Sequence, residues 1–210
     1  TKFMSQARQI LLVCEQRDMI EFTDNIKNHA LSRHQFDPSS GKIELDLESS
    51  HKSSCYTTNT QVNFCARSYE TVSSGHPDAP ILSVLGGILR NGYLHQAIRE
   101  IGGAYGGGAS QDSDSGAFRF FSYRDPRLSE TLHDFDQAIA WIKSKPASEQ
   151  MIEEAILGVI SSLDKPKSPS GEAKEAFFLQ LNGRNEHTVN EFRNRVLKVC
   201  SKDIDRVANK

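Results

Sequence analysis

A cluster of glycines in the middle of the chain restricts what the surrounding backbone can form. Five of the 14 glycines lie in residues 102–108, where the only larger residues are Ala104 and Tyr105. Two glycines are enough to end a helix, so five indicate a backbone that other atoms approach closely. An ordinary turn does not account for this composition.

The residues on both sides of the glycines predict one continuous structural unit. A helix is expected to end at Gly102 and Gly103, since the apolar residues before them recur at three- and four-residue spacing: Leu94, Ala97, Ile98 and Ile101. Residues 117–123 read as a strand, and Asp125 and Pro126 predict a helix with proline at its first position. The expected order is helix, glycine-lined strand, hairpin, strand, helix.

Composition excludes several classes of protein. The 210 residues suffice for one large domain or two small ones, with 37% hydrophobic and 25% charged residues. A net charge of -2 does not favour a nucleic-acid or anionic-membrane partner. Neither a transmembrane run nor a signal segment is visible, so we expect a cytoplasmic protein, or one of the mitochondrial matrix or another organelle if the source is eukaryotic. A first residue of Thr1 hints at a fragment.

Known catalytic motifs are missing from the sequence. The four cysteines form no C-x-x-C pair, and neither H-x-x-E-H nor H-E-x-x-H occurs among the seven histidines. We therefore expect free thiols and no metal bound by this chain. The glycines follow a helix instead of preceding one, which disfavours a nucleotide site, and G-x-S-x-G is absent.

Residues before the glycine cluster predict a strand at 9–13, a helix at 18–31, an irregular connection at 32–60 and a strand at 61–70. Within the connection, Ile43, Leu45 and Leu47 alternate with charges as in an edge strand. The strand at 61–70 places Val62, Phe64 and Ala66 on one face, the alternation of a half-buried strand.

A central buried helix is expected from about Pro80, with Asp78 capping it. Gly86 and Gly87 inside this helix predict a close crossing by another element, and Asn91 with Gly92 predicts a kink. Further helices are expected at 128–142, at 148–163 with Ser148 as cap, at 171–181 and at 188–207, with a loop at 164–171. The fold class is α+β: a two-layer sandwich of one mixed or mainly antiparallel sheet with helices on one face. We expect a single domain over residues 1–210.

Arg99 and Tyr105 bracket the first glycines and admit two interpretations. Arg99 could be a solvated base near a helix end, and Tyr105 a strand aromatic buried in the core. Alternatively both project into a cleft, where the guanidinium and the phenol donate hydrogen bonds to carbonyl oxygens of a bound chain while the glycines admit its backbone.

At these residues the chain resembles a known family. LHQAIREIGGAYG at residues 94–106, followed by FSYRDP at 121–126, is similar to the C-terminal half of pitrilysin-type zinc peptidases, and most to the presequence-peptidase branch. In that family two homologous halves close around a chamber, and the zinc motif lies in the N-terminal half. The resemblance implies a processing-peptidase-like metallohydrolase domain.

The resemblance also implies roles for individual residues. Arg99 and Tyr105 match the family's Arg and Tyr that hold the substrate and help polarise the scissile carbonyl. Gly102, Gly103, Ala104 and Gly106 are then expected to contact substrate. The implied partners are unfolded peptides and the N-terminal catalytic half of the same polypeptide, without nucleic acid or membrane. Zinc is implied for the full-length enzyme and not for this chain, which alone should be inactive.

An alternative from a different class is a non-catalytic homologue that only binds peptides, similar to the inactive subunit of processing peptidases. Loss of the Arg99 and Tyr105 equivalents would be expected there, so their presence favours the enzyme. A nucleotide-binding module is the third hypothesis and would need an anion at a helix N-terminus.

Overall fold

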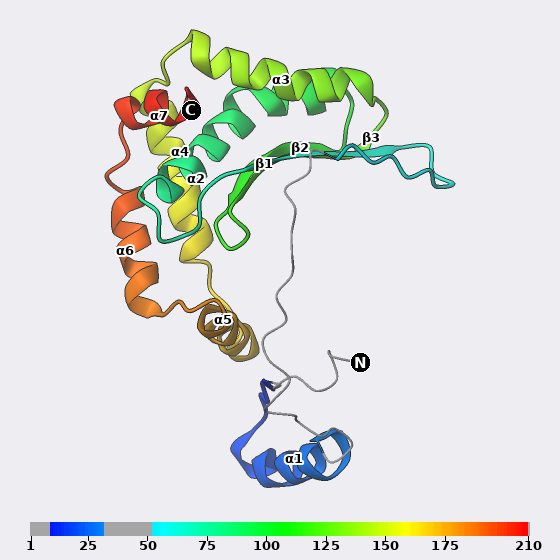
Figure 1. Cartoon of the computed structure of the whole chain (residues 1–210), viewed down its shortest axis with the longest axis vertical. Coiled ribbons are helices and arrows are strands. Elements are labelled where there is room, and N and C mark those ends of the chain that lie inside the picture. Colours follow the sequence, from blue (N-terminus) through cyan, green and yellow to red (C-terminus); the bar gives the residue numbers. More distant parts are fainter. Residues whose placement is uncertain (1–8, 32–51, 210) are drawn as a thin grey trace. The chain divides into compact units, whose positions relative to one another are not determined.

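The computed structural model describes residues 9–31 and 52–209, and the chain divides into two compact units. The first unit comprises Thr1–Thr57 and Lys167–Phe178, and the second comprises Thr58–Pro166 and Leu179–Lys210. Each is described by itself (Figure 1). Among the helices in the described ranges, none combines the length and apolar character needed to cross a membrane.

The first unit contains short helices and no buried residue among positions 9–29. A 3-10 turn (Gln16–Asp18) leads into α1 (Met19–Asn25) and the π-helix η3 (Ile26–Leu31), which confirms the helix predicted at 18–31. Helix α5 (Pro169–Leu181) confirms the helix predicted at 171–181. The strand predicted at 9–13 is wrong, because this run has no partner strand in the described part of the chain, and Ile10 is 48% exposed. Ile43, Leu45 and Leu47 lie outside the described residues.

The second unit is built on a three-stranded antiparallel sheet. Its strands are β1 (Asn63–Glu70), β2 (Gly106–Asp112) and β3 (Ala117–Asp125), in the order β1-β3-β2, so that β2 pairs on one side only. Helix α2 (Ala79–Leu89) and the π-helix η4 (Arg90–Ile101) pack on β2, and α3 (Ser129–Ser144) packs on β1. Figure 1 shows α2, η4 and α3 on the same side of the sheet. The predicted α+β class with helices on one face is confirmed.

Three further helices complete this unit, α4 (Glu149–Leu163), α6 (Glu186–Val196) and α7 (Ser201–Ala208). Ser148 caps α4 as predicted, accepting a hydrogen bond from the N–H of Met151 at 3.3 Å. A single helix at 188–207 is wrong, since residues 197–200 separate α6 from α7. The new helix is started by a local cap, in which the N–H of Cys200 donates to Asp203 at 3.2 Å.

The core lies between the sheet and the helices. Phe120 on β3 sits against Phe118 and against Phe135 on α3, with ring centroids 5.4 and 5.6 Å apart. Helix α2 is buried over most of its surface, as its apolar sequence predicts. Each such side chain contributes about 1.5–3 kcal/mol through removal from water.

Gly86 and Gly87 allow the close crossing that the sequence predicted. A Cβ on Gly86 would lie 3.2 Å from the carbonyl oxygen of Ala109 on β2, and a Cβ on Gly87 would lie 3.1 Å from the Cβ of Ala155 on α4. Helix α2 therefore packs backbone to backbone against β2 on one side and close against α4 on the other.

Some local predictions are corrected by tertiary contacts. Helix α3 starts at Ser129 and not at Pro126, since the Asp125 carboxylate accepts from the N–H of Arg127 at 2.9 Å and from the Thr131 hydroxyl at 2.8 Å. Asp78 does precede α2, but it makes no side-chain cap bond and pairs with Arg206 at 2.8 Å.

Two more corrections concern faces and helix continuity. On β1 the buried residue is Cys65, opposite Ser122, whereas Phe64 is 65% exposed, so the apolar face of the pattern points away from the helices. At Asn91 and Gly92 the helix does not break but changes from α to π hydrogen bonding at Arg90. Gly92 is required there because a Cβ would overlap Trp141 and Met151.

Candidate functional site

The turn after η4 has the tight geometry that its glycines predict. Gly102 is the C-cap, with its N–H 3.0 Å from the carbonyl oxygen of Ala97, and the N–H of Gly103 donates to Arg99 at 3.1 Å. Gly103 has φ +78°, which favours glycine. The chain then enters β2 through Ala104 and Tyr105, so Arg99 and Tyr105 lie on either side of one turn.

Both candidate side chains are exposed to solvent. Arg99 is exposed and its guanidinium has no hydrogen bond or ion pair with any residue in the described ranges. Tyr105 is 62% exposed, so the interpretation as a core aromatic is wrong. For Arg99 the solvated position near a helix end and a role in binding both remain compatible with this placement.

Tyr105 is held by two residues to which sequence analysis gave no role. Its N–H donates to the carbonyl oxygen of Arg124 at 3.2 Å, and its ring lies 5.6 Å from that of Tyr123 at an interplanar angle of 58°. The Arg124 guanidinium lies 5.5 Å from the centre of the Tyr105 ring, a cation–π contact. Arg124 has φ +48°, an unusual backbone conformation for a residue with a side chain. Both supporting residues belong to FSYRDP, which resembled the family without revealing this packing.

Arg127 is a second support that the sequence did not reveal. Its Nη2 donates to the carbonyl oxygen of Ala97 at 3.1 Å and pairs with Asp134 on α3 at 2.9 Å. A Cβ on Gly102 would overlap this guanidinium. Arg127 thus connects the end of η4 to α3, and no local sequence signal indicates such a long-range bond.

The close approach predicted for the glycines is made by the protein's own atoms. A Cβ on Gly106 would lie 2.6 Å from the Tyr123 hydroxyl, and a Cβ on Gly107 would lie 2.8 Å from the carbonyl oxygen of Phe121. Ala104 is 4% exposed, so its side chain points into the protein. Internal packing therefore explains these residues, and substrate contact by Gly102, Gly103, Ala104 and Gly106 stays a prediction.

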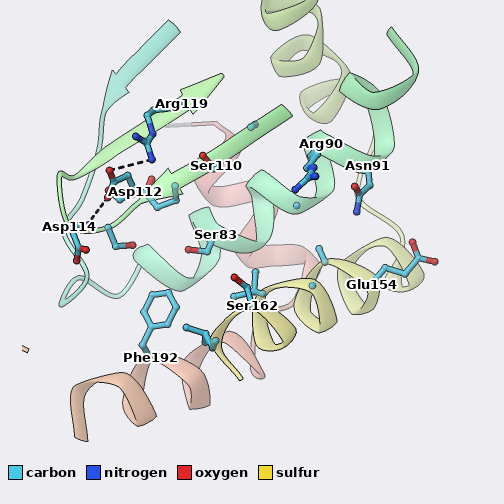
Figure 2. A pocket seen from close by; sticks show the side chains of 18 of the residues that line it. Ser83, Arg90, Asn91, Ser110, Asp112, Asp114, Arg119, Glu154, Ser162 and Phe192 are labelled. Atoms are coloured by element: carbon cyan, nitrogen blue, oxygen red, sulfur yellow. Dashed lines mark hydrogen bonds and ion pairs between the residues drawn. The ribbon is translucent and has the colours of Figure 1, made fainter. Parts of the chain in front are cut away.

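A separate open cleft of about 550 Å³ lies along the other end of β2. Figure 2 shows its walls, formed by β2 with the hairpin that follows it, by α2, by α4 and by Phe192 on α6. Sequence analysis did not identify this cleft, because its walls come from segments far apart in the chain.

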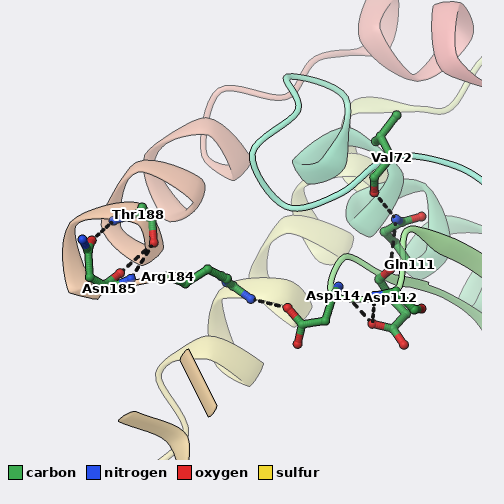
Figure 3. A network of polar contacts seen from close by, with 8 residues as sticks. Val72, Gln111, Asp112, Asp114, Arg184, Asn185 and Thr188 are labelled. Carbon is green, nitrogen blue, oxygen red and sulfur yellow. Dashed lines mark hydrogen bonds and ion pairs between the residues drawn. The ribbon is translucent and has the colours of Figure 1, made fainter. Parts of the chain in front are cut away.

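Ion pairs close the hairpin end of the cleft. Arg119 pairs with Asp112 at 3.3 Å, and Arg184 pairs with Asp114 at 2.7 Å. Figure 3 shows Arg184 reaching Asp114 from the segment before α6, and the Gln111 amide donating to the carbonyl oxygen of Val72 at 3.0 Å. These contacts fix the hairpin between β2 and β3.

A metal site was not expected in this chain. Over residues 9–31 and 52–209, no three His, Cys, Asp or Glu side chains are grouped so that they could hold a metal ion. Burial raises the pKa of the Cys65 thiol, which keeps it protonated and unsuited as a ligand.

Comparison with known proteins identifies the family. Residues 54–210 match the sequence profile described as the PreP C-terminal domain. The mitochondrial presequence protease of Emericella nidulans is 37% identical over 171 residues, which is 81% of this chain and 16% of that protein. The corresponding protein of Xenopus laevis is 39% identical over 149 residues, 71% of this chain and 14% of that protein. The chain therefore spans a small part of these relatives.

Solved structures share the fold at lower sequence identity. A protease of Helicobacter pylori has a TM-score of 0.62 at 16% identity, covering 95% of this chain and 50% of that one. The inactive domain of an M16 peptidase from Pseudomonas fluorescens has a TM-score of 0.54 at 16% identity, covering 70% of this chain and 37% of that one. The family profile and the identity with presequence proteases show that the chain belongs to the PreP C-terminal domain family.

Proposed function

We propose that this chain is the substrate-binding C-terminal part of a zinc metalloendopeptidase that degrades unfolded peptides in a closed chamber. The observation that carries the proposal is the placement of Arg99 and Tyr105, both exposed and on either side of one rigid turn. Membership of the PreP C-terminal domain family supports it, as do relatives named presequence protease.

The chemistry of the two side chains suits a carbonyl oxygen. A guanidinium and a phenol are both hydrogen-bond donors, and they stabilise an oxygen on which negative charge develops during peptide hydrolysis. The described residues do not supply a zinc site, so the metal and the water that it activates belong to the N-terminal half in this proposal. The part of this chain is to hold and orient the peptide.

The relatives also suggest a location. Both presequence proteases compared above are named as mitochondrial proteins. We include a mitochondrial location in the proposal, in place of the cytoplasmic one that sequence composition suggested first.

The test uses the full-length enzyme that contains this chain. Arg99→Ala and Tyr105→Phe should each lower kcat/KM for an unstructured peptide by about 10²-fold, because each removes a donor to the developing charge. The melting temperature should not change, since neither side chain is in the core. Arg17→Ala and Tyr56→Phe are matched controls, because Arg17 and Tyr56 are also exposed.

Wild-type kcat/KM in both variants would refute the assignment of these residues. A full-length protein that binds the peptide but never cleaves it would instead support the non-catalytic homologue.

A further inference from the structure

Strand β2 has one edge without a partner strand in the described part of the chain. The sheet order β1-β3-β2 leaves it paired with β3 alone. In an antiparallel pair, alternate residues direct their N–H and C=O groups to the outer side, where they can pair with another extended chain. Any segment lying along this edge would find a row of donors and acceptors.

The cleft of about 550 Å³ runs along this edge. Its lining includes the consecutive residues 109–114. Because successive side chains of a strand point to opposite faces, an unbroken run of lining residues means that the cleft follows the edge of the strand and not one face. The backbone of β2 is therefore accessible from the cleft.

The wall provided by α4 leaves room beside the strand. Gly158 lines the cleft, and a Cβ placed on it would meet no atom within 4 Å. Ser83 on α2 and Ser162 on α4 add hydroxyl groups to the lining (Figure 2). A cleft of this size suits a short peptide segment.

Charge in the cleft is balanced except at Arg90. Arg119 and Arg184 pair with Asp112 and Asp114, as described above. Arg90 has no hydrogen bond or ion pair with any residue that the structure describes, although its stem is fixed by packing on Gly108, where a Cβ would lie 2.9 Å from its Cγ. Its guanidinium is the cation that remains for a ligand. A carboxylate is its natural partner.

We propose that this cleft binds an extended peptide segment by strand addition to β2, with an acidic side chain of the peptide at Arg90. The unpaired edge accounts for recognition of a peptide backbone, and Arg90 accounts for selection of an acidic residue. The inference rests on the proposed function in that the ligand is a peptide. It uses residues other than Arg99 and Tyr105.

The binding test uses the 210-residue chain labelled with ¹⁵N. The probe is an acetylated and amidated peptide of alternating threonine and glutamine with one central glutamate, long enough to span β2. Amide shifts should change at Ala109, Ser110 and Gln111 and at Arg90. The same peptide with alternate backbone nitrogens methylated should not bind, because it cannot complete the ladder. Replacing its glutamate with lysine should weaken binding about tenfold, the size expected for a charged hydrogen bond.

Variants of the chain separate the two parts of the proposal. Gly158→Leu fills the cleft and should weaken binding at least about tenfold, while the helix itself gains stability. Gly75→Leu is the matched control, since a Cβ on Gly75 also meets no atom within 4 Å and Gly75 is not in the cleft. Arg90→Gln should reduce the affinity for the glutamate peptide to that for the lysine peptide. Unchanged shifts outside the cleft will show that each variant is folded.

Equal binding of the methylated peptide, or full affinity in Gly158→Leu, would overturn the proposal. Arg99→Ala and Tyr105→Phe should leave binding of this probe unchanged. The cleft can therefore fail while the assignment of Arg99 and Tyr105 stands, and the reverse also holds.

Discussion

Arg127 links the turn that carries Arg99 and Tyr105 to helix α3. Its side chain is 24% exposed, and the Asp134 side chain that pairs with it is 17% exposed. A bond of this kind orders the end of η4 without contacting a ligand. We regard Arg127 as a positioning residue in the proposed function.

Replacement of Arg127 tests that role. Arg127→Met should lower the free energy of unfolding by about 2 kcal/mol, because Asp134 and the carbonyl group of Ala97 lose a partner in a partly buried place. Chemical denaturation measures the effect. Arg119→Met is the control, with its more exposed ion pair, and should cost less than about 1 kcal/mol. Equal losses in both variants would contradict the positioning role.

Asp112 gives the hairpin a dependence on pH. Burial alone would raise the pKa of its carboxyl group, but hydrogen bonds from the Ser115 side chain and from the N–H groups of Ser115 and Asp114, together with the charge of Arg119, lower it below the usual value. A carboxyl group with a lowered pKa in the folded state stabilises the protein above its unfolded pKa. This contribution is lost as the pH falls through the folded pKa.

The corresponding prediction compares Asp112→Asn with the wild type. Above about pH 5 the variant should be less stable by up to about 1 kcal/mol, since Asp112 is partly exposed. The difference should shrink as the pH falls below about 4. Denaturant titrations at several pH values measure it. A gap that stays constant over this range would show that the charge of Asp112 contributes nothing.

At the scale of elements, β2 shows how a glycine-rich strand is built into a core. Its side chains are small because η4, α2 and β3 approach its backbone closely. Gly108 accommodates Arg90, and Gly86 on α2 meets Ala109 of the strand. The strand is thin where its neighbours are thick.

Gly107→Val should therefore destabilise the chain even without any ligand. Its Cβ would lie 2.8 Å from the carbonyl oxygen of Phe121 and 3.1 Å from the Cγ2 of Ile98, so the expected loss is about 2–3 kcal/mol, typical of overpacking. Thermal and chemical unfolding measure it. Gly158→Ala, where a Cβ is free, should instead gain up to about 1 kcal/mol. A Gly107→Val chain as stable as the wild type would refute the packing explanation.

For the whole molecule, the division of labour between this chain and the rest of the enzyme follows from what is buried. The buried apolar residues found in the described ranges all lie from Cys65 onward, in the second unit. These residues build a core and a binding surface. The reacting groups of a hydrolase are not among those that the described residues bring together.

The 210-residue chain should accordingly bind no stoichiometric zinc and cleave no peptide. Metal analysis after dialysis and a peptide-cleavage assay measure both. Adding the N-terminal half as a second chain should restore hydrolysis, and Arg99→Ala should remove that gain. One tightly bound zinc per chain, or cleavage by this chain alone, would refute its assignment as the zinc-free part.

The sequence by itself determined the features that depend on local pattern. Periodic apolar residues predicted α2, α3 and α4, Ser148 marked the start of α4, and the glycines marked the end of η4 and the strand that follows. These signals are local because a helix or a cap is decided by residues within one or two turns. The motif around Arg99 and Tyr105 was sufficient to suggest the family that the profile match shows.

Tertiary structure alone decided which face of a strand is buried, where a helix starts and what a glycine is for. The apolar alternation of β1 put Phe64 with the hydrophobic residues, yet pairing of Cys65 with Ser122 placed Phe64 in solvent. The carboxylate of Asp125, bonded to Thr131 and Arg127, moved the start of α3. The atoms beside Gly107 and the bond from Arg127 to Ala97 come from residues distant in the chain. Contacts of this kind depend on how elements pack in space, which the periodicity of one segment does not encode.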